Sequence, residues 1–239
     1  MAKKKTKFYA VRNTNQIFED WKSCEAVVKG LSGADFKSFA TREKAEAFLK
    51  GTVVVPKESL AVSYESSSGI SGSIQVAEEI DPFTIGLNGF VYAVDGSFNT
   101  TTGVYGGAFA CYDNGTLVGS GSQSGSKENF ATARNVAGEI TAFGLAIEDA
   151  IKRGLTSITV ICDYEGIFRW AAPSTVKVNG VACWGATNSS PISKYHAYLL
   201  SLAYMKGLHQ IDFIWVRGHR GVSSNELVDK LAKESVGLK

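Results

Sequence analysis

From position 87 onward, the pattern of apolar and polar residues predicts a mixed α/β domain. Three strand-like stretches come first, and the hairpin signal Asp-Asn-Gly at 113–115 joins the second to the third. Between 135 and 154, apolar residues recur at steps of three and four, which indicates an amphipathic helix. The run at 157–162 is continuously apolar, as expected of a parallel strand that is buried on both faces.

The remainder of the chain continues this alternation of helix and strand. A helix is predicted to begin at Tyr164, another over 193–207, a strand over 211–216 and a last helix after the capping residue Ser223. The order is three antiparallel strands, helix, strand, helices, strand and helix. We therefore expect an α/β fold with a mixed five-stranded sheet that is flanked by helices, with ligand-binding loops at the strand ends.

The front of the chain reads as a separate unit. Residues 7–50 predict the order strand, strand, helix, strand, helix, which is a small α+β module. Residues 51–86 are rich in Ser and Gly with little to bury, so they are predicted to be a flexible linker. The expected domains are therefore 1–50, the linker 51–86, and 87–239.

Bulk composition narrows the class of protein. The chain has 239 residues, 44% of them hydrophobic, which is enough for a sizeable core. No apolar run approaches the roughly 20 residues that span a membrane, and no secretory signal follows the first lysines. None of the four cysteines forms a Cys-x-x-Cys pair, as expected where thiols stay reduced. We therefore expect a cytoplasmic protein without membrane contact, and a monomer.

Charge is distributed unevenly along the chain. Residues 1–50 hold eleven Lys and Arg against six Asp and Glu, a balance of +5, while the whole chain carries only +2, which leaves −3 for the rest. The excess suggests an anionic partner for the front module. The alternative is a solvated lysine run, because Lys3, Lys4 and Lys5 supply three of the five charges.

Four acidic residues stand at ends of predicted elements, where a carboxylate does not help to build a core: Asp95, Glu139, Asp163 and Asp229. Gathered in one place, they would repel one another unless divalent cations lay between them. Carboxylate oxygens select Mg²⁺ or Mn²⁺ over zinc, and two such ions can promote in-line displacement at phosphorus. Taken singly, Asp163 could be a helix cap, Asp229 a surface helix residue and Glu139 an ion-pair partner of Arg134. The four together favour a metal-dependent phosphodiesterase.

His219 lies in a Gly-flanked loop between the last predicted strand and the last helix. A histidine there could shuttle a proton or assist product release. It could equally be an ordinary surface histidine.

These residues carry a resemblance to the type 1 ribonuclease H family over roughly 87–239. The segment GHRGVSSNELVDKLAKE resembles the family pattern of His-x-Gly, Asn-Glu and Asp-x-Leu-Ala, which places His219 and Asp229 in register. Asp95, Glu139 and Asp163 match the remaining family acids. The resemblance implies a ribonuclease H-like fold and endonucleolytic cleavage of the RNA strand of an RNA/DNA hybrid. It also implies two Mg²⁺ ions, with Mn²⁺ as a possible substitute.

Within residues 1–50, the segments FYAVR and FKSFAT and the pair Trp21 and Cys24 resemble the hybrid-binding domain that precedes some of these enzymes. By that resemblance, Trp21 and Phe36 stack on deoxyribose rings, while Tyr9 and Lys37 help to hold the backbone. Aromatic platforms beside basic residues also suit nucleic acid on general grounds. The alternative is that Trp21 and Phe36 form the core of a very small module.

The resemblance further implies RNA recognition through 2′-hydroxyl groups, with contacts from backbone groups near Gly96 and Ser97 and around Asn135. The chain departs from the family at ARNVAGE, where the spacing from Asn135 to the glutamate is one residue longer. It also departs at 171–193, which holds only Lys177 where many relatives have a basic arm. Two other functions stay open, namely a non-catalytic hybrid or double-stranded RNA binding protein and a metal nuclease that acts on DNA.

Overall fold

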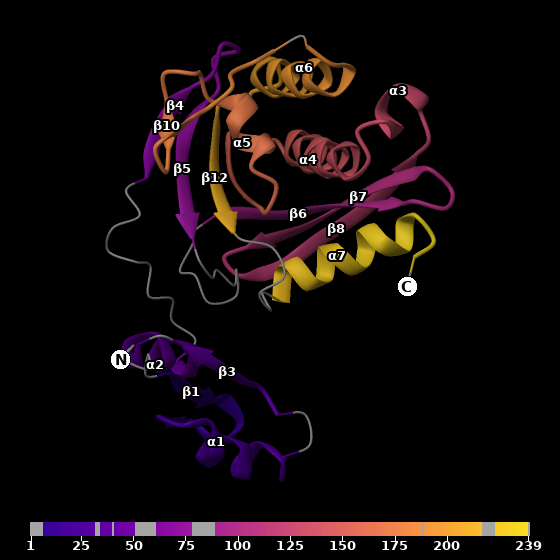
Figure 1. The fold of residues 1–239 in the computed structure, drawn as a ribbon. Coiled ribbons are helices and arrows are strands. Elements are labelled where there is room, and N and C mark those ends of the chain that lie inside the picture. The colour runs from indigo at the N-terminus through magenta and orange to yellow at the C-terminus, as the bar shows by residue number, and fades with distance from the viewer. Residues whose placement is uncertain are drawn as a thin grey trace. The chain divides into compact units, whose positions relative to one another are not determined.

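The computed structural model describes residues 7–31, 34–39, 41–50, 61–77, 89–187, 189–216 and 223–238, and these form two compact units. The N-terminal unit has a three-stranded antiparallel sheet of order β2-β1-β3, with two helices (Figure 1). Its elements are β1 Phe8–Val11, the 3-10 helix η1 Arg12–Thr14, β2 Gln16–Phe18, α1 Trp21–Val28, β3 Phe36–Phe39 and α2 Arg42–Lys50.

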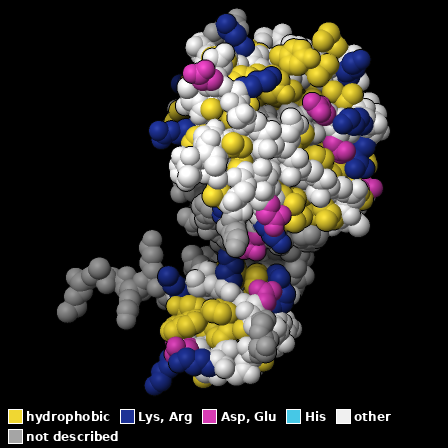
Figure 2. Space-filling view, turned by 90° about the vertical axis from the view of Figure 1, so that its right-hand side faces the viewer, with side chains coloured by type: hydrophobic (Ala, Val, Ile, Leu, Met, Phe, Trp, Pro, Cys, Tyr) yellow, Lys and Arg dark blue, Asp and Glu magenta, His cyan; other side chains and the backbone are white. Residues whose placement is uncertain are grey.

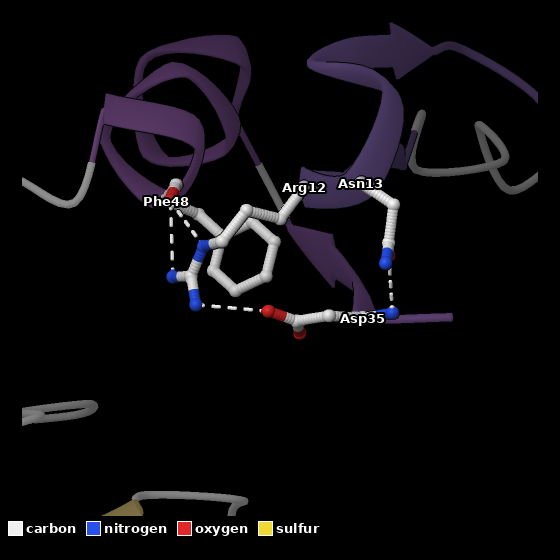
Figure 3. Close-up of polar contacts among 4 residues, drawn as sticks. All are labelled: Arg12, Asn13, Asp35 and Phe48. Carbon is white, nitrogen blue, oxygen red and sulfur yellow. Dashed lines mark hydrogen bonds and ion pairs between the residues drawn. The ribbon is translucent and has the colours of Figure 1, made fainter. Parts of the chain in front are cut away.

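Local sequence explains how this small unit is held together. The Asp20 side chain caps α1 by accepting a hydrogen bond from the Ser23 backbone N–H at 2.9 Å. The Arg12 guanidinium donates to Asp35 Oδ2 at 2.9 Å and to the carbonyl of Phe48, and it lies 4.1 Å from the centre of the Phe48 ring (Figure 3). One side chain thereby joins the end of β1 to α2 and to the segment before β3.

The C-terminal unit contains a seven-stranded mixed sheet of order β4-β5-β12-β9-β6-β7-β8. Its strands are β4 Val62–Glu65, β5 Ser71–Ala77, β6 Phe90–Asn99, β7 Val104–Asp113, β8 Thr116–Gly125, β9 Ser157–Cys162 and β12 Gln210–Val216. Its helices are α3 Glu128–Ala131, α4 Asn135–Lys152, α5 Gly166–Ala171, α6 Pro191–Met205 and α7 Ser223–Ser235. Strands β6, β7 and β8 form the predicted antiparallel meander, and β9 and β12 run parallel to β6. The mixed α/β sheet with helices is therefore confirmed.

Helices cover both faces of this sheet. Adjacent residues of a strand point to opposite faces, and a Cβ on Gly106 would meet Ser235 of α7 and the following Val236, while one on Gly107 would meet Ala142 of α4. The two helices therefore pack on opposite faces of β7, as Figure 1 shows, with α6 on the α4 side. Among the described residues, no helix is both long and apolar enough to span a bilayer.

One prediction needs correction. The linker predicted at 51–86 is wrong over 62–77, because β4 and β5 lie in the sheet, which consequently has seven strands rather than five. The Ser- and Gly-rich composition obscured four buried apolar residues in this segment: Tyr64, Ile70, Ile74 and Ala77. The glycines there are also part of the packing, since a Cβ on Gly72 would come within 2.0 Å of the Ile211 carbonyl oxygen.

A second difference concerns the segment after α5, for which no structure was predicted. Lys177–Val178 and Val181–Ala182 form a short antiparallel hairpin, β10–β11, around Asn179 and Gly180, both with positive φ. The buried Arg169 side chain donates from Nη1 to the Val181 carbonyl at 3.1 Å and to the next carbonyl at 3.2 Å. A structured hairpin thus stands in the segment where the sequence lacks a basic arm.

Candidate active site

Three of the four predicted acids come together from three different elements. Asp95 lies midway along β6, Glu139 lies in the second turn of α4, and Asp163 directly follows β9. Each offers a carboxylate oxygen, and these oxygens all lie within 4.8 Å of one another. The sheet register explains the convergence, because β6 pairs in parallel with β9 and Ala93 lies beside Ile161, two residues before each aspartate.

Glycines bring the glutamate to the strand. A Cβ on Gly96 would lie 2.2 Å from the Glu139 backbone nitrogen, and a Cβ on Gly138 would lie 2.7 Å from the Ser97 nitrogen. Both distances are shorter than real Cβ contacts, so a side chain at either glycine would push α4 away from β6. The glycines that flank Asp95 and Glu139 are therefore part of the site's construction.

The cluster is buried and electrostatically strained. Asp95 and Glu139 are 7% and 6% exposed. Asp95 Oδ1 accepts a hydrogen bond from the Gly96 N–H, whereas the buried Glu139 Oε2 has no hydrogen-bond partner among the described residues. Burial, followed by the charge of Asp163, raises the pKa of Asp95 to about 7. Burial, followed by the charges of Asp95 and Asp163, raises the pKa of Glu139 well above its ordinary range.

This donor set fits divalent cations. An unpaired buried carboxylate oxygen and three mutually repelling acids are stabilised when positive charge is placed between them. All the available ligand atoms are hard oxygens, which suit Mg²⁺ or Mn²⁺. The residues that could hold such an ion are therefore Asp95, Glu139 and Asp163.

Asp229 is placed differently from the other three acids. It lies on α7, is not part of the three-carboxylate group among the described residues, and accepts a 2.7 Å hydrogen bond from Lys233 Nζ. Its charge nevertheless contributes to raising the pKa of Asp95, so it acts on the same site. The Lys233 pair gives Asp229 a partner that the sequence reasoning did not consider.

The other predicted site residues are distributed around the cluster or lie outside what can be described. Gly96 and the buried Ser97 follow Asp95 on β6, and the exposed Asn135 is the first residue of α4. His219 lies outside the described residues. The roles predicted for all four stay predictions.

Two residues near the acids were missed by sequence reasoning. Trp215 Nε1 donates to the Asp163 carbonyl oxygen at 2.8 Å and so positions the backbone of that residue from β12. Tyr164 is half-buried, and burial followed by the charge of Glu139 raises its pKa to about 12. The only sequence signal for either was its position at the end of an apolar run.

In the N-terminal unit, three aromatic residues line up. The ring centres of Tyr9 and Trp21 lie 5.5 Å apart, and those of Trp21 and Phe36 lie 5.6 Å apart. Trp21 and Phe36 are each 41% exposed, so they are not the core of this unit, which is built around Ala10 and Cys24. Figure 2 shows hydrophobic side chains gathered on one face of this unit with Lys and Arg side chains beside them.

Sequence comparison decides the family. The profile of the RNase H family matches residues 88–236, more than half of the chain. The chain belongs to the ribonuclease H family. All four predicted acids lie within the ribonuclease H segment, and residues 7–49 match a second family, the Ribonuclease H1 N-terminal domain.

Individual relatives carry the same name. The chain is 38% identical to Ribonuclease H of Acidiphilium cryptum over 98 residues, which cover 39% of this chain and 56% of that protein. It is 24% identical to Ribonuclease H of Saccharomyces cerevisiae over 261 residues, which cover 95% of this chain and 68% of that protein. RNase H1 of the archaeon Halobacterium salinarum is a similar solved structure, with 19% identity, a TM-score of 0.47, and coverage of 62% of this chain and 97% of that one.

Proposed function

We propose that this protein is an endonuclease that hydrolyses the RNA strand of RNA/DNA hybrids by a two-metal-ion mechanism. The observation that carries the proposal is the group of buried Asp95, buried Glu139 and partly buried Asp163, with oxygens within 4.8 Å of one another and, among the described residues, no hydrogen-bond partner for Glu139 Oε2. Membership of the ribonuclease H family supports the choice of reaction.

The acids have distinct tasks in this proposal. Asp95, Glu139 and Asp163 hold the cations, and Asp229 adds negative charge from α7. Bound divalent cations would supply activation of the attacking water and stabilisation of the leaving 3′-oxygen. The chain's own contribution is to orient its carboxylates and to hold them close together in a largely buried position, which the Gly96 N–H and the close packing of α4 on β6 support.

Substrate recognition is proposed to use both units. In the N-terminal unit, Trp21 and Phe36 offer exposed faces to sugar rings, with Tyr9 beside Trp21, and Lys37 is proposed to help hold the nucleic-acid backbone. In the catalytic unit, groups near Gly96, Ser97 and Asn135 would contact the 2′-hydroxyls that distinguish RNA from DNA. His219 is proposed to assist proton transfer or product release.

A cleavage assay with matched duplexes tests the function. One sequence is labelled on one strand and supplied as RNA/DNA, RNA/RNA and DNA/DNA duplexes, with Mg²⁺ and with chelator. We expect cuts only in the RNA strand of the hybrid, and only with metal. Hybrid binding without cleavage would support a non-catalytic binding protein, and cleavage of DNA/DNA would support a DNA nuclease.

The Asp163→Asn variant supplies the matched control. It removes one charge from the carboxylate group and keeps the side-chain shape, so cleavage is expected to fall below detection while hybrid binding stays. Turnover near the wild-type rate would contradict the metal-site assignment. A slower rate in a folded His219→Ala variant would support a role for His219, and an unchanged rate would remove it from the mechanism.

A further inference from the structure

Strands β4 and β5 belong to neither family match. They occupy residues 62–77, between the matched segments 7–49 and 88–236. They are nevertheless built into the catalytic sheet, with β5 paired to β12 in parallel and β4 paired to β5 in antiparallel fashion. Their role is therefore a question that the family comparison leaves open.

Several contacts fasten this hairpin to the sheet. The Tyr64 hydroxyl donates to the Ile211 carbonyl oxygen at 2.8 Å, and Asp212 Oδ1 accepts from the backbone N–H and the hydroxyl of Ser73 at 2.8 and 2.6 Å. Ile70 and Ile74 are buried in the main core. Each contact joins the hairpin to the folded body, so the hairpin is a fixed part of the catalytic unit.

The register shows at which end of the sheet the chain enters. Ala77 at the end of β5 lies beside Val216 of β12, and Trp215 lies beside Cys162, the residue before Asp163. The carboxyl end of β5 is therefore the catalytic end of the sheet. Because β4 is antiparallel to β5, the chain enters β4 from this catalytic end.

If the chain joined the sheet directly at β6, it would join at the opposite end. Val91 lies beside Thr159 of the parallel strand β9, so β6 begins at the opposite end of the sheet, five residues before Asp95. Without the hairpin, the chain leaving α2 at Lys50 would first join the sheet there, after the 39 residue steps to Gly89. With the hairpin, it joins after the 11 steps to Ala61.

These step counts limit how far the connection can reach. At about 3.6 Å per residue, 11 steps span at most about 40 Å, whereas 39 steps could span about 140 Å. Strand β4 lies three strand spacings from β9, which is about 14 Å at ~4.8 Å per spacing. The fully extended connection plus this offset is about 54 Å, or on the order of 16 base pairs at ~3.4 Å each.

We propose that the β4–β5 hairpin is a substrate-positioning device, which fastens the connection to the hybrid-binding module at the catalytic end of the sheet. It thereby limits how far along a hybrid the module can be bound while the RNA strand is cut. The inference rests on the proposed function, since it assumes that both units engage one hybrid. For a flexible tether that is long enough to span both bound units, the effective concentration falls as roughly the −3/2 power of tether length, so 11 steps in place of 39 would raise it about sevenfold.

The test lengthens the connection while the hairpin stays in place. A 28-residue Gly/Ser insertion between residues 55 and 56 restores the 39-step length. The matched control carries the same insertion between Asn114 and Gly115, in the β7–β8 turn, which lies at the non-catalytic end because Asp113 pairs with Phe90. KM is measured on hybrids from about 6 to 40 base pairs, and Kd on the same series in the Asp163→Asn background.

On hybrids too short for both units to bind, wild type, the variant with the insertion at residue 55 and the control insertion variant are expected to give the same KM. On hybrids above about 20 base pairs, the insertion at residue 55 is expected to raise KM and Kd about sevenfold, while the control insertion leaves both unchanged. Equal values for all three proteins at every length would overturn the proposal, as would an equal rise in the control. If wild type cuts no hybrid, the proposed function fails, and the Kd series still tests the hairpin.

A second variant releases the hairpin itself. Gly72→Val places side-chain atoms where a Cβ already lies 2.0 Å from the Ile211 carbonyl oxygen, so β5 must leave β12. If the folded variant shows the same rise in KM and Kd as the insertion at residue 55, the hairpin is what fastens the connection to the sheet. If it stays folded with β5 released, seen as rapid proteolysis within 61–77, and KM is unchanged, the proposal is wrong. If the variant does not fold, the insertion series decides alone.

Discussion

Asp95 and Glu139 are kept in the fold at a cost in stability, because both are buried beside other carboxylates. The folded-state pKa of Asp95, about 7, lies above its ordinary value of 3.8. Between these two pH values the folded protein binds more protons than the unfolded chain, so metal-free stability is expected to fall as pH rises from about 4 to 7. The arrangement of these carboxylates is thus suited to binding cations and lowers the stability of the metal-free protein.

Replacing Asp95 by Asn is therefore expected to stabilise the metal-free protein at pH 7. One pKa unit corresponds to about 1.4 kcal/mol, and we expect a gain on the order of 2 kcal/mol after coupling to the other acids is allowed for. Urea unfolding in the presence of chelator measures this difference in unfolding free energy. With saturating Mg²⁺, wild type should instead be the more stable of the two proteins. Asp113→Asn, at the non-catalytic end of β7, is the control, and an equal gain there would contradict the assignment.

His196 predicts a pH effect of opposite sign. Its ring is fully buried and stacked on Phe143, Nε2 lies 2.8 Å from the Ile167 carbonyl oxygen, and burial lowers its pKa to about 4. In the unfolded chain this histidine takes up a proton near pH 6.5, whereas in the folded protein it does so only near pH 4. The free energy of unfolding is therefore unaffected by this group above pH 6.5 and falls as the pH is lowered from 6.5 toward 4. With saturating Mg²⁺, His196→Phe should flatten the fall in unfolding free energy over this window. An unchanged slope would show that another group titrates.

Individual elements differed in how well the sequence predicted them. Helix α4 was predictable because its apolar residues recur at helical spacing, and β9 because its run is continuously apolar. Strand β5 was not predictable, because its fit depends on Gly72 meeting Ile211, a contact between residues far apart in the sequence. The acids were predictable as candidates from their positions, but the Lys233 partner of Asp229 and the Trp215 contact to Asp163 arise only on folding.

At the element scale, α1 and β3 present an aromatic surface that can be tested separately from stability. Because Trp21 and Phe36 are both 41% exposed, the double substitution to Ala should leave the module folded. Stacking on an aromatic contributes about 1–3 kcal/mol, so Kd for hybrid should rise at least tenfold. Fluorescence anisotropy measures Kd, with Leu117→Ala, another exposed apolar residue at 45%, as the control. An unchanged Kd would remove this surface from substrate binding.

For the whole molecule, the uneven charge predicts how binding responds to salt. Residues 1–50 carry +5 and the remainder −3, so deletion of 1–50 changes the protein from net positive to net negative. Binding to a polyanion releases counterions, and the logarithm of the binding constant falls with the logarithm of salt concentration in proportion to the phosphates neutralised. The truncated protein should therefore bind hybrid more weakly and with a shallower salt slope, measured between about 50 and 200 mM salt.

Because the carboxylate group lies wholly within the second unit, the kcat of the truncated protein on saturating short hybrids should be retained. Equal affinity at every salt concentration would mean that the front unit does not hold substrate, and that recognition belongs to the catalytic unit alone.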